Sequence, residues 1–193
     1  DLSIASTVNG AANVTLTGAT LTLGAAWGAT TALGNVTLTA TNSISLPAIT
    51  TAAGKTVDVT VTGAGNSITT TGAIATGAAG NITLTADDLI LGGNLSGTGT
   101  ITLQPYATNR TMSLNYGSAD GTTLHLSTTE LAYLIDGWTL INIGRSDTAT
   151  NYRTYIGAST WYDSVNFRGW DDVVQGALVG QAGVNFTISG SLG

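Results

Sequence analysis

The chain has 193 residues, enough for one domain with a continuous core, and only 8% of them are charged. Five Lys and Arg against eleven Asp and Glu give a formal net charge of −6, which excludes the basic surface that nucleic acids and anionic membranes attract. There is no cysteine, so disulfides and thiolate metal sites are excluded, and no stretch approaches the roughly 20 apolar residues that membrane insertion requires.

The first half of the chain repeats one strand pattern in which an apolar residue alternates with Thr. The repeats begin at Val14, Val36, Val59 and Ile82, so successive starts are 22, 23 and 23 residues apart. A fixed period of about 20–30 residues with one strand pattern in each repeat indicates a solenoid. Asn13, Asn35 and Asn81 stand just before three of these strands, where the chain must turn. Shorter apolar segments lie between the repeats, at 19–24, 43–49, 66–74 and 88–93.

Side chains in a strand alternate between two faces, so the apolar residues and the Thr residues of each repeat point in opposite directions. We expect the apolar set to form buried ladders: Val14, Leu16, Val36, Leu38, Val59, Val61, Ile82 and Leu84. We expect the Thr set to form an outward two-column array: Thr15, Thr17, Thr37, Thr39, Thr60, Thr62, Thr83 and Thr85.

The pattern changes near residue 104. Ten of the twelve aromatic residues, all four Arg and the only His fall within 105–170. Residues 126–137 are the one helix candidate, because Ser127 and Glu130 have the spacing of a capping box. We therefore predict an all-β fold, a right-handed parallel β-helix of about eight or nine coils with one short inserted helix near 128–135. It forms a single module over 1–193, with regular Thr-rich coils in 1–103 and elaborated aromatic and Arg-rich coils in 104–193.

Several segments resemble the repeat or stalk regions of large bacterial exoproteins of the filamentous-haemagglutinin type. They are "GNVTLTAT" (34–41), "GNITLTAD" (80–87), "LSGTGTITLQPY" (95–106), "LSTTELAYLIDGWTLINIGRSD" (126–147) and "GASTWYDSVNFRG" (157–169). The resemblance implies a right-handed β-helix that is secreted or carried on a bacterial cell surface and acts in adhesion or as an extracellular fibre. The Asn-Pro-Asn-Gly-type motif of the secretion domain in that family does not occur in this sequence.

We accordingly expect a non-enzymatic structural or adhesive module without a cofactor. The first and last segments, "DLSIAST" and "VNFTISGSLG", are alternating strands without a cap, so we expect head-to-tail stacking on copies of the chain or on adjacent tandem modules. Surface glycans or other cells are further expected partners. Aromatic residues and Arg are enriched at interfaces, and the alternative is that they fill a wider core. The interface candidates are Trp138, Tyr152, Arg153, Tyr155, Trp161, Tyr162 and Trp170.

Two other functions remain open. The outward Thr array could bind ice, because its hydroxyl and methyl groups would lie on a regular grid. A polysaccharide-acting β-helix enzyme is the second, but Lys55 is isolated, and adjacent carboxylates in a strand face opposite sides, as at Asp87-Asp88 and Asp171-Asp172. We interpret these pairs as solvated turn aspartates, and His125 as an exposed strand residue. A structural calcium ion is the one metal considered, near turn aspartates Asp120, Asp136, Asp147 and Asp163.

Overall fold

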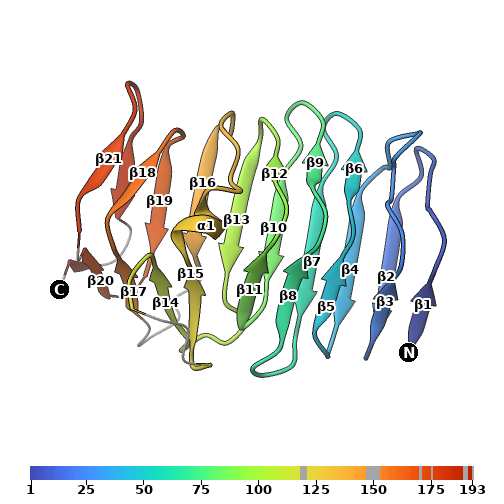
Figure 1. Ribbon diagram of the computed structural model, residues 1–193, viewed down its shortest axis with the longest axis horizontal. Coiled ribbons are helices and arrows are strands. Elements are labelled where there is room, and N and C mark those ends of the chain that lie inside the picture. Colours follow the sequence, from blue (N-terminus) through green and yellow to red (C-terminus); the bar gives the residue numbers. More distant parts are fainter. Residues whose placement is uncertain (118–120, 147–152, 170, 175, 189–190, 193) are drawn as a thin grey trace.

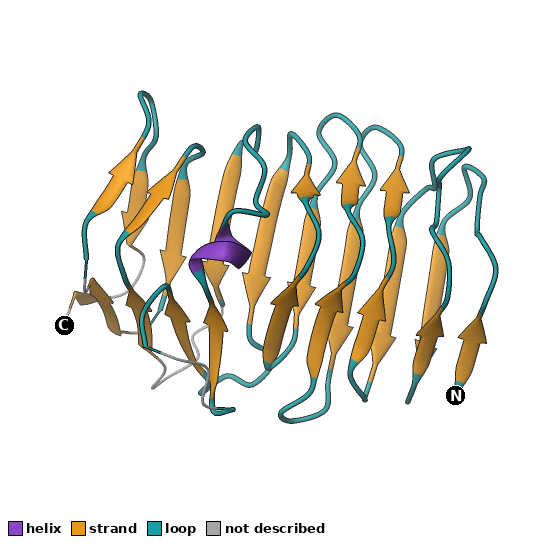
Figure 2. Cartoon of the chain, viewed as in Figure 1, coloured by secondary structure: helices purple, strands orange, loops and turns teal. Residues whose placement is uncertain are grey.

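The computed structural model describes residues 1–193 except 118–120, 147–152, 170, 175, 189–190 and 193. The chain winds into a right-handed parallel β-solenoid of about eight turns, with the two termini at opposite ends (Figure 1). Strands account for nearly all of its regular structure, and one short helix projects from one side (Figure 2). The predicted fold class is confirmed.

One face of the solenoid is an uninterrupted parallel sheet of eight strands, one from each turn. Its inward positions form two apolar columns, which run from Val14 to Phe186 and from Leu16 to Ile188. In its central strands these residues are completely buried, and each such side chain stabilises the fold by about 1.5–3 kcal/mol. The strands are, in order, β2 (Val14–Gly18), β4 (Val36–Ala40), β7 (Val57–Val61), β10 (Ile82–Thr85), β13 (Thr100–Gln104), β16 (Leu140–Gly144), β19 (Val165–Arg168) and β22 (Phe186–Ile188).

Two rows of shorter strands lie end to end opposite this sheet (Figure 1). The second face contains β1 (Leu2–Ile4), β3 (Leu21–Leu23), β5 (Ile44–Leu46), β8 (Ser67–Thr70), β11 (Asp88–Leu91), β15 (Thr123–Leu126), β14 (Thr111–Leu114), β17 (Arg153–Ile156), β20 (Asp171–Val174) and β23 (Ser191–Leu192). The third face contains β6 (Ile49–Thr51), β9 (Ile74–Thr76), β12 (Leu95–Ser96), β18 (Ser159–Trp161) and β21 (Leu178–Gly180).

The repeated Gly-Asn dipeptides have a structural cause. The side-chain oxygen of Asn13 accepts a hydrogen bond from the backbone N–H of Asn35, 2.8 Å away in the next turn. A Cβ added at Gly34 would lie 2.4 Å from that same oxygen, so glycine leaves the space that the neighbouring Asn occupies. Asn81 repeats the arrangement, accepting from the N–H of Thr100 at 2.7 Å beside Gly99. The octapeptide repeat therefore joins adjacent turns as well as reversing the chain.

The predicted register of the third repeat is wrong by two residues. Val57, not Val59, lies opposite Val36, and Leu38 lies opposite Val59. An even shift keeps every side chain on its predicted face, because the side-chain period of a strand is two. The apolar prediction is thus confirmed for six of the eight named residues, while Val14 and Leu16 in the first rung are only partly buried.

The predicted helix exists, but it is a single turn, α1 (Thr128–Leu131). The capping box is confirmed. The Ser127 hydroxyl accepts from the Glu130 N–H at 3.3 Å, and the Glu130 carboxylate accepts from the Ser127 N–H at 2.9 Å. The other Glu130 oxygen accepts from the N–H of Leu91 at 3.2 Å and so ties the helix to β11. Gly137, the last residue of the helix candidate 126–137, has a φ of +130° but lies six residues beyond α1.

Candidate functional site

The regular order of the turns is broken once, between β13 and β16. After β13 the chain forms β14, then turns back and forms β15 on the N-terminal side of β14. The second face therefore contains β15 and β14 between β11 and β17, whereas β13 and β16 pair directly on the eight-stranded face. The second face has one strand more than the first at this level.

Among the described residues, the third face has no strand at the level of β14. On one side Leu134 forms a bridge with Leu95 of β12, and on the other side β18 pairs with β21 and with no other described strand. A cleft of about 590 Å³ opens between them, within the usual size range of ligand sites. Its lining residues are Asn115, Thr128, Leu131, Ala132, Leu134, Ile141, Ala158, Ser159, Thr160, Trp161, Tyr162, Asp163, Ala177 and Val179.

Side chains bridge the cleft at both ends. At one end Asn115 donates its side-chain amide to the carbonyl of Ala158 at 2.6 Å and accepts from the hydroxyl of Thr128 at 2.6 Å. Asn115 has a φ of +47°, in the left-handed region that Asn tolerates better than most residues. At the other end Asp163 accepts from the N–H of Gly137 at 3.1 Å. These contacts join the two turns where no strand does.

Electrostatically, the cleft is nearly neutral. Of the described residues that line it, Asp163 alone is charged, and none is Lys or Arg. Burial raises the pKa of the Asp163 carboxyl above its ordinary value, against the opposing effect of the backbone amides of Gly137 and Trp138, and nearby Asp136 raises it further. The remaining lining is apolar, aromatic or hydroxyl-bearing, which suits an uncharged ligand.

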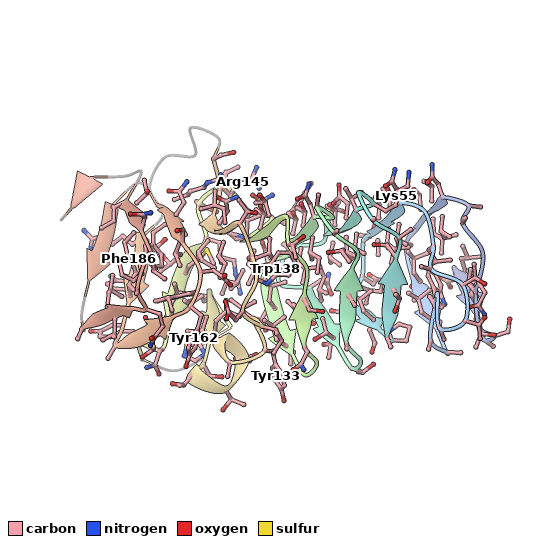
Figure 3. All side chains as sticks on the ribbon, turned by 90° about the horizontal axis from the view of Figure 1, so that it is seen from above. Lys55, Tyr133, Trp138, Arg145, Tyr162 and Phe186 are labelled. Carbon is pink, nitrogen blue, oxygen red and sulfur yellow. The ribbon has the colours of Figure 1, made fainter. Side chains whose placement is uncertain are left out.

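The aromatic interface candidates divide between core and surface. Trp138 and Trp161 are each only 3% exposed, so their side chains belong to the core and not to a contact surface. Tyr162 is 59% exposed at the cleft, on the same side of the solenoid as Tyr133 (Figure 3). Tyr155 stacks on Tyr116 with ring centroids 5.4 Å apart. Arg153 is exposed, whereas Tyr152 and Trp170 lie outside the described residues.

The Thr array covers the outer surface of the eight-stranded sheet, but it is less regular than predicted. Because of the shifted register, Asp58 stands between Thr37 and Thr83 in the first column, and Thr62 falls outside β7. Thr85 keeps its place in the second column but is buried, and its hydroxyl accepts from the Gln104 side chain at 3.0 Å. Thr15 and Thr17 are exposed, and Thr37, Thr39, Thr60 and Thr83 are partly exposed.

The candidate acid, base and metal residues have mostly structural contacts. Asp87 is not solvated as predicted: it is 2% exposed, and its oxygens accept from the N–H groups of Gly65 at 2.9 Å and Ala107 at 2.8 Å. His125 lies in β15 on the face opposite Leu124 and Leu126, but it is partly buried and not exposed as predicted. Lys55 and Arg145 lie on the side of the solenoid opposite Tyr162 (Figure 3).

Among the described residues, no group of three or more His, Asp or Glu residues is placed to hold a metal ion. Of the four calcium candidates, Asp120 and Asp147 lie outside the described residues. The side chains of the carboxylate pair Asp171-Asp172 are also outside the described part of the structure.

The cleft is not predicted by the sequence patterns. Its one local signal is Asn115, which follows the strand-like "TMSL" where the chain reverses. Within the described ranges, no helix is long and apolar enough to cross a membrane. Comparisons with protein-family models, curated proteins and solved structures found no match for this chain.

Proposed function

We propose that the protein is a non-enzymatic structural and adhesive module whose solenoid continues end to end into a fibre or stalk. The observation that carries the proposal is a difference in burial along the inward columns. Val36 and Val165 are fully buried in the middle, whereas Val14 and Phe186 in the outermost rungs of the same columns are only partly buried. Another rung at either end would bury these side chains, which is the arrangement that stacked repeats require.

The backbone edge at the N-terminal end supports the same proposal. β2 is the outermost strand of the eight-stranded sheet, and its Val14 N–H bonds to the carbonyl of Asn35 in the neighbouring turn. Because alternate residues of a parallel strand bond in opposite directions, the N–H groups of Thr15 and Thr17 face outward along the axis. Neither charge nor proline occurs in β2 to block a further strand. The rung that pairs there can come from the same chain or from another copy.

A role outside the cell, on a bacterial surface, is part of the proposal because of the resemblance to exoprotein repeats. The non-enzymatic assignment is supported by the hydrogen bonds that the candidate acids make within the fold. Asp87 and Asp163 accept backbone hydrogen bonds that hold turns together, and within the described residues the Arg110 and Arg145 side chains donate to backbone carbonyls. Groups held in this way stabilise the scaffold.

The test is sedimentation velocity of the isolated 193-residue chain over a wide concentration range, with negative-stain images of the same samples. The wild type should form linear oligomers that lengthen with concentration. Thr15→Pro removes an outward N–H without touching the ladder to β4, so it should shorten them, whereas Thr15→Val keeps the N–H and should not. A chain that stays monomeric at every concentration contradicts the proposal.

A further inference from the structure

We propose that the cleft beside β18 is a peptide-binding slot, in which an extended polypeptide segment of another protein pairs with the free edge of β18 as an additional strand. The inference concerns a lateral surface and does not depend on end-to-end stacking. It follows from the uneven number of strands on the three faces.

The slot lies on the third face where one strand is missing compared with the second face. At successive levels the second face presents β11, β15, β14 and β17, and the third face presents β12, Leu134, no strand, and β18. Strands of one sheet lie about 4.8 Å apart, so one extra strand on the second face separates Leu134 from β18 by one additional spacing. The cleft lies in that interval and extends past β18 to Ala177 and Val179 at β21, with Leu131 and Leu134 on one wall and Thr160 and Trp161 on the other.

The edge of β18 that faces the slot has no strand partner in the described structure. The Ser159 N–H bonds to the carbonyl of Ala177, and the Trp161 carbonyl accepts from the N–H of Gln181, so both residues face β21. Alternation then directs the N–H and C=O of Thr160 toward the cleft. Residues 158–162 are Ala-Ser-Thr-Trp-Tyr, without the charge, proline or bulge that usually protects such an edge.

The shape of the slot selects an extended segment over a folded surface. Its ends are closed by the bonds of Asn115 to Ala158 and of Asp163 to Gly137, which leave residues 159–162 between them. Four residues of extended chain span about 13 Å. A second copy of the solenoid presents strands only as part of a wide sheet, which does not fit a space one strand wide. A loop or tail of another protein does fit.

The lining also defines the chemistry of the segment. Leu131, Leu134 and Ile141 supply an apolar part of the lining, so alternate residues of the bound segment should be apolar. Tyr162, which is exposed, can cover the outer side. Because Asp163 is the one charged residue in the described lining, an acidic peptide is disfavoured at that end. This is recognition by strand addition, in which the backbone gives affinity and alternate pockets give selectivity.

The proposal is tested by selecting a displayed library of random octapeptides on the folded full chain. Selected peptides should alternate apolar and polar residues, and the N–H groups of Thr160 and Tyr162 should exchange with solvent more slowly when a synthetic copy is bound. Thr160→Pro removes the N–H that faces the slot and should weaken binding about tenfold or more, whereas Thr160→Val should bind like the wild type.

Circular dichroism verifies that both variants fold, and the exchange measurement on the wild type decides the matter if Thr160→Pro does not fold. Several results would overturn the proposal. One is a selection that yields no binder, or binders unaffected by Thr160→Pro. Another is protection that appears only outside residues 158–163. Occupation of the cleft by a saccharide or by a second copy of the chain, detected as displacement of the selected peptide, also contradicts it.

Discussion

The indole ring of Trp138 packs over Gly97, so closely that a Cβ added at Gly97 would lie 2.6 Å from the ring and closer still to the hydroxyl oxygen of Thr76. Gly97 directly follows β12, and Trp138 precedes β16, 41 residues later in the chain. The large Trp138 side chain fills the interior next to the cleft, and Gly97 leaves room for it because glycine has no side chain. It explains why this tryptophan, a candidate for a surface contact by composition, is buried.

Gly97→Ala should therefore destabilise the protein by about 1–3 kcal/mol, the usual cost of overpacking. The free energy of unfolding in urea measures it. Gly18→Ala is the matched control, because its nearest neighbour is the flexible end of Leu21 at 3.2 Å, and it should be close to neutral. Equal losses for the two variants would show that the Trp138 contact does not constrain position 97.

Asn115 should be the most sensitive position at the cleft. Asn115→Ala removes the bonds to Ala158 and Thr128 and puts a Cβ-bearing residue without a local hydrogen bond at a φ of +47°, so it should cost about 2–3 kcal/mol. Asn115→Gly also removes both bonds but accepts the backbone conformation, so it should cost only about 1–2 kcal/mol. Urea unfolding of the three proteins separates the two contributions, and a glycine variant less stable than the alanine variant would contradict this explanation.

Glu130 should stabilise the fold well beyond its own helical turn. Glu130→Ala removes the acceptor for Ser127 and for the N–H of Leu91, and should cost about 1–2 kcal/mol. Glu130→Gln retains one acceptor oxygen and should cost less. Thr129→Ala, at an exposed neighbouring position, should change stability by less than about 0.5 kcal/mol. Amide hydrogen exchange tests the link between the helix and β11. If exchange in Glu130→Ala becomes faster only within α1 and not at the N–H of Leu91, that link does not stabilise the fold.

The sequence predicts the regular part of this fold well because each turn repeats the same local signals. Apolar/Thr alternation fixes which residues face the core, and this survives the two-residue register error at Val57. The register itself depends on loop length. The turns from β4 to β7 and from β7 to β10 contain loops of unequal length. Equal spacing of similar tetrapeptides therefore does not predict which residues pair. Asn35 shows that the turn signals also carry contacts between turns.

The cleft could not be predicted in this way, because it results from the order in which strands are placed. Nothing in the local pattern of "TMSL" or "TLHL" says that β15 lies on the N-terminal side of β14. Likewise the burial of Trp161 depends on packing across the interior of its own turn, against Phe167 of β19, whose ring lies 5.8 Å away in an edge-to-face arrangement. Such contacts between different faces have no signature in the residues next to them.

Asp58 is the one carboxylate in the first Thr column. Its side chain is exposed, but partial desolvation by its neighbours raises the pKa of Asp58 above its ordinary value of 3.8. The folded state therefore binds its proton more tightly than the unfolded state does, and the ionised carboxylate lowers stability. This loss is complete above the raised pKa, decreases as the pH falls through it, and is absent below 3.8. Thr also has a higher β propensity than Asp.

Asp58→Thr should thus stabilise the protein at pH 7 by about 0.5–1 kcal/mol from β propensity alone, on a scale that spans about 1 kcal/mol. Removal of the charge should add to this gain at pH 7 but not below pH 3.8, so the advantage shrinks on acidification. Asp58→Asn isolates the charge effect. Urea unfolding at several pH values between 3 and 7 measures both. An advantage that does not change with pH would contradict the role of the partly desolvated Asp58 carboxylate.

The same variant discriminates the ice-binding alternative, because it joins Thr37 and Thr83 into one continuous column. If the outer sheet binds ice, Asp58→Thr should increase thermal hysteresis and Thr37→Tyr should abolish it, since a bulky ring interrupts the flat array. If the sheet only carries a structural role, all three proteins should show no hysteresis, while the gain in stability of Asp58→Thr remains.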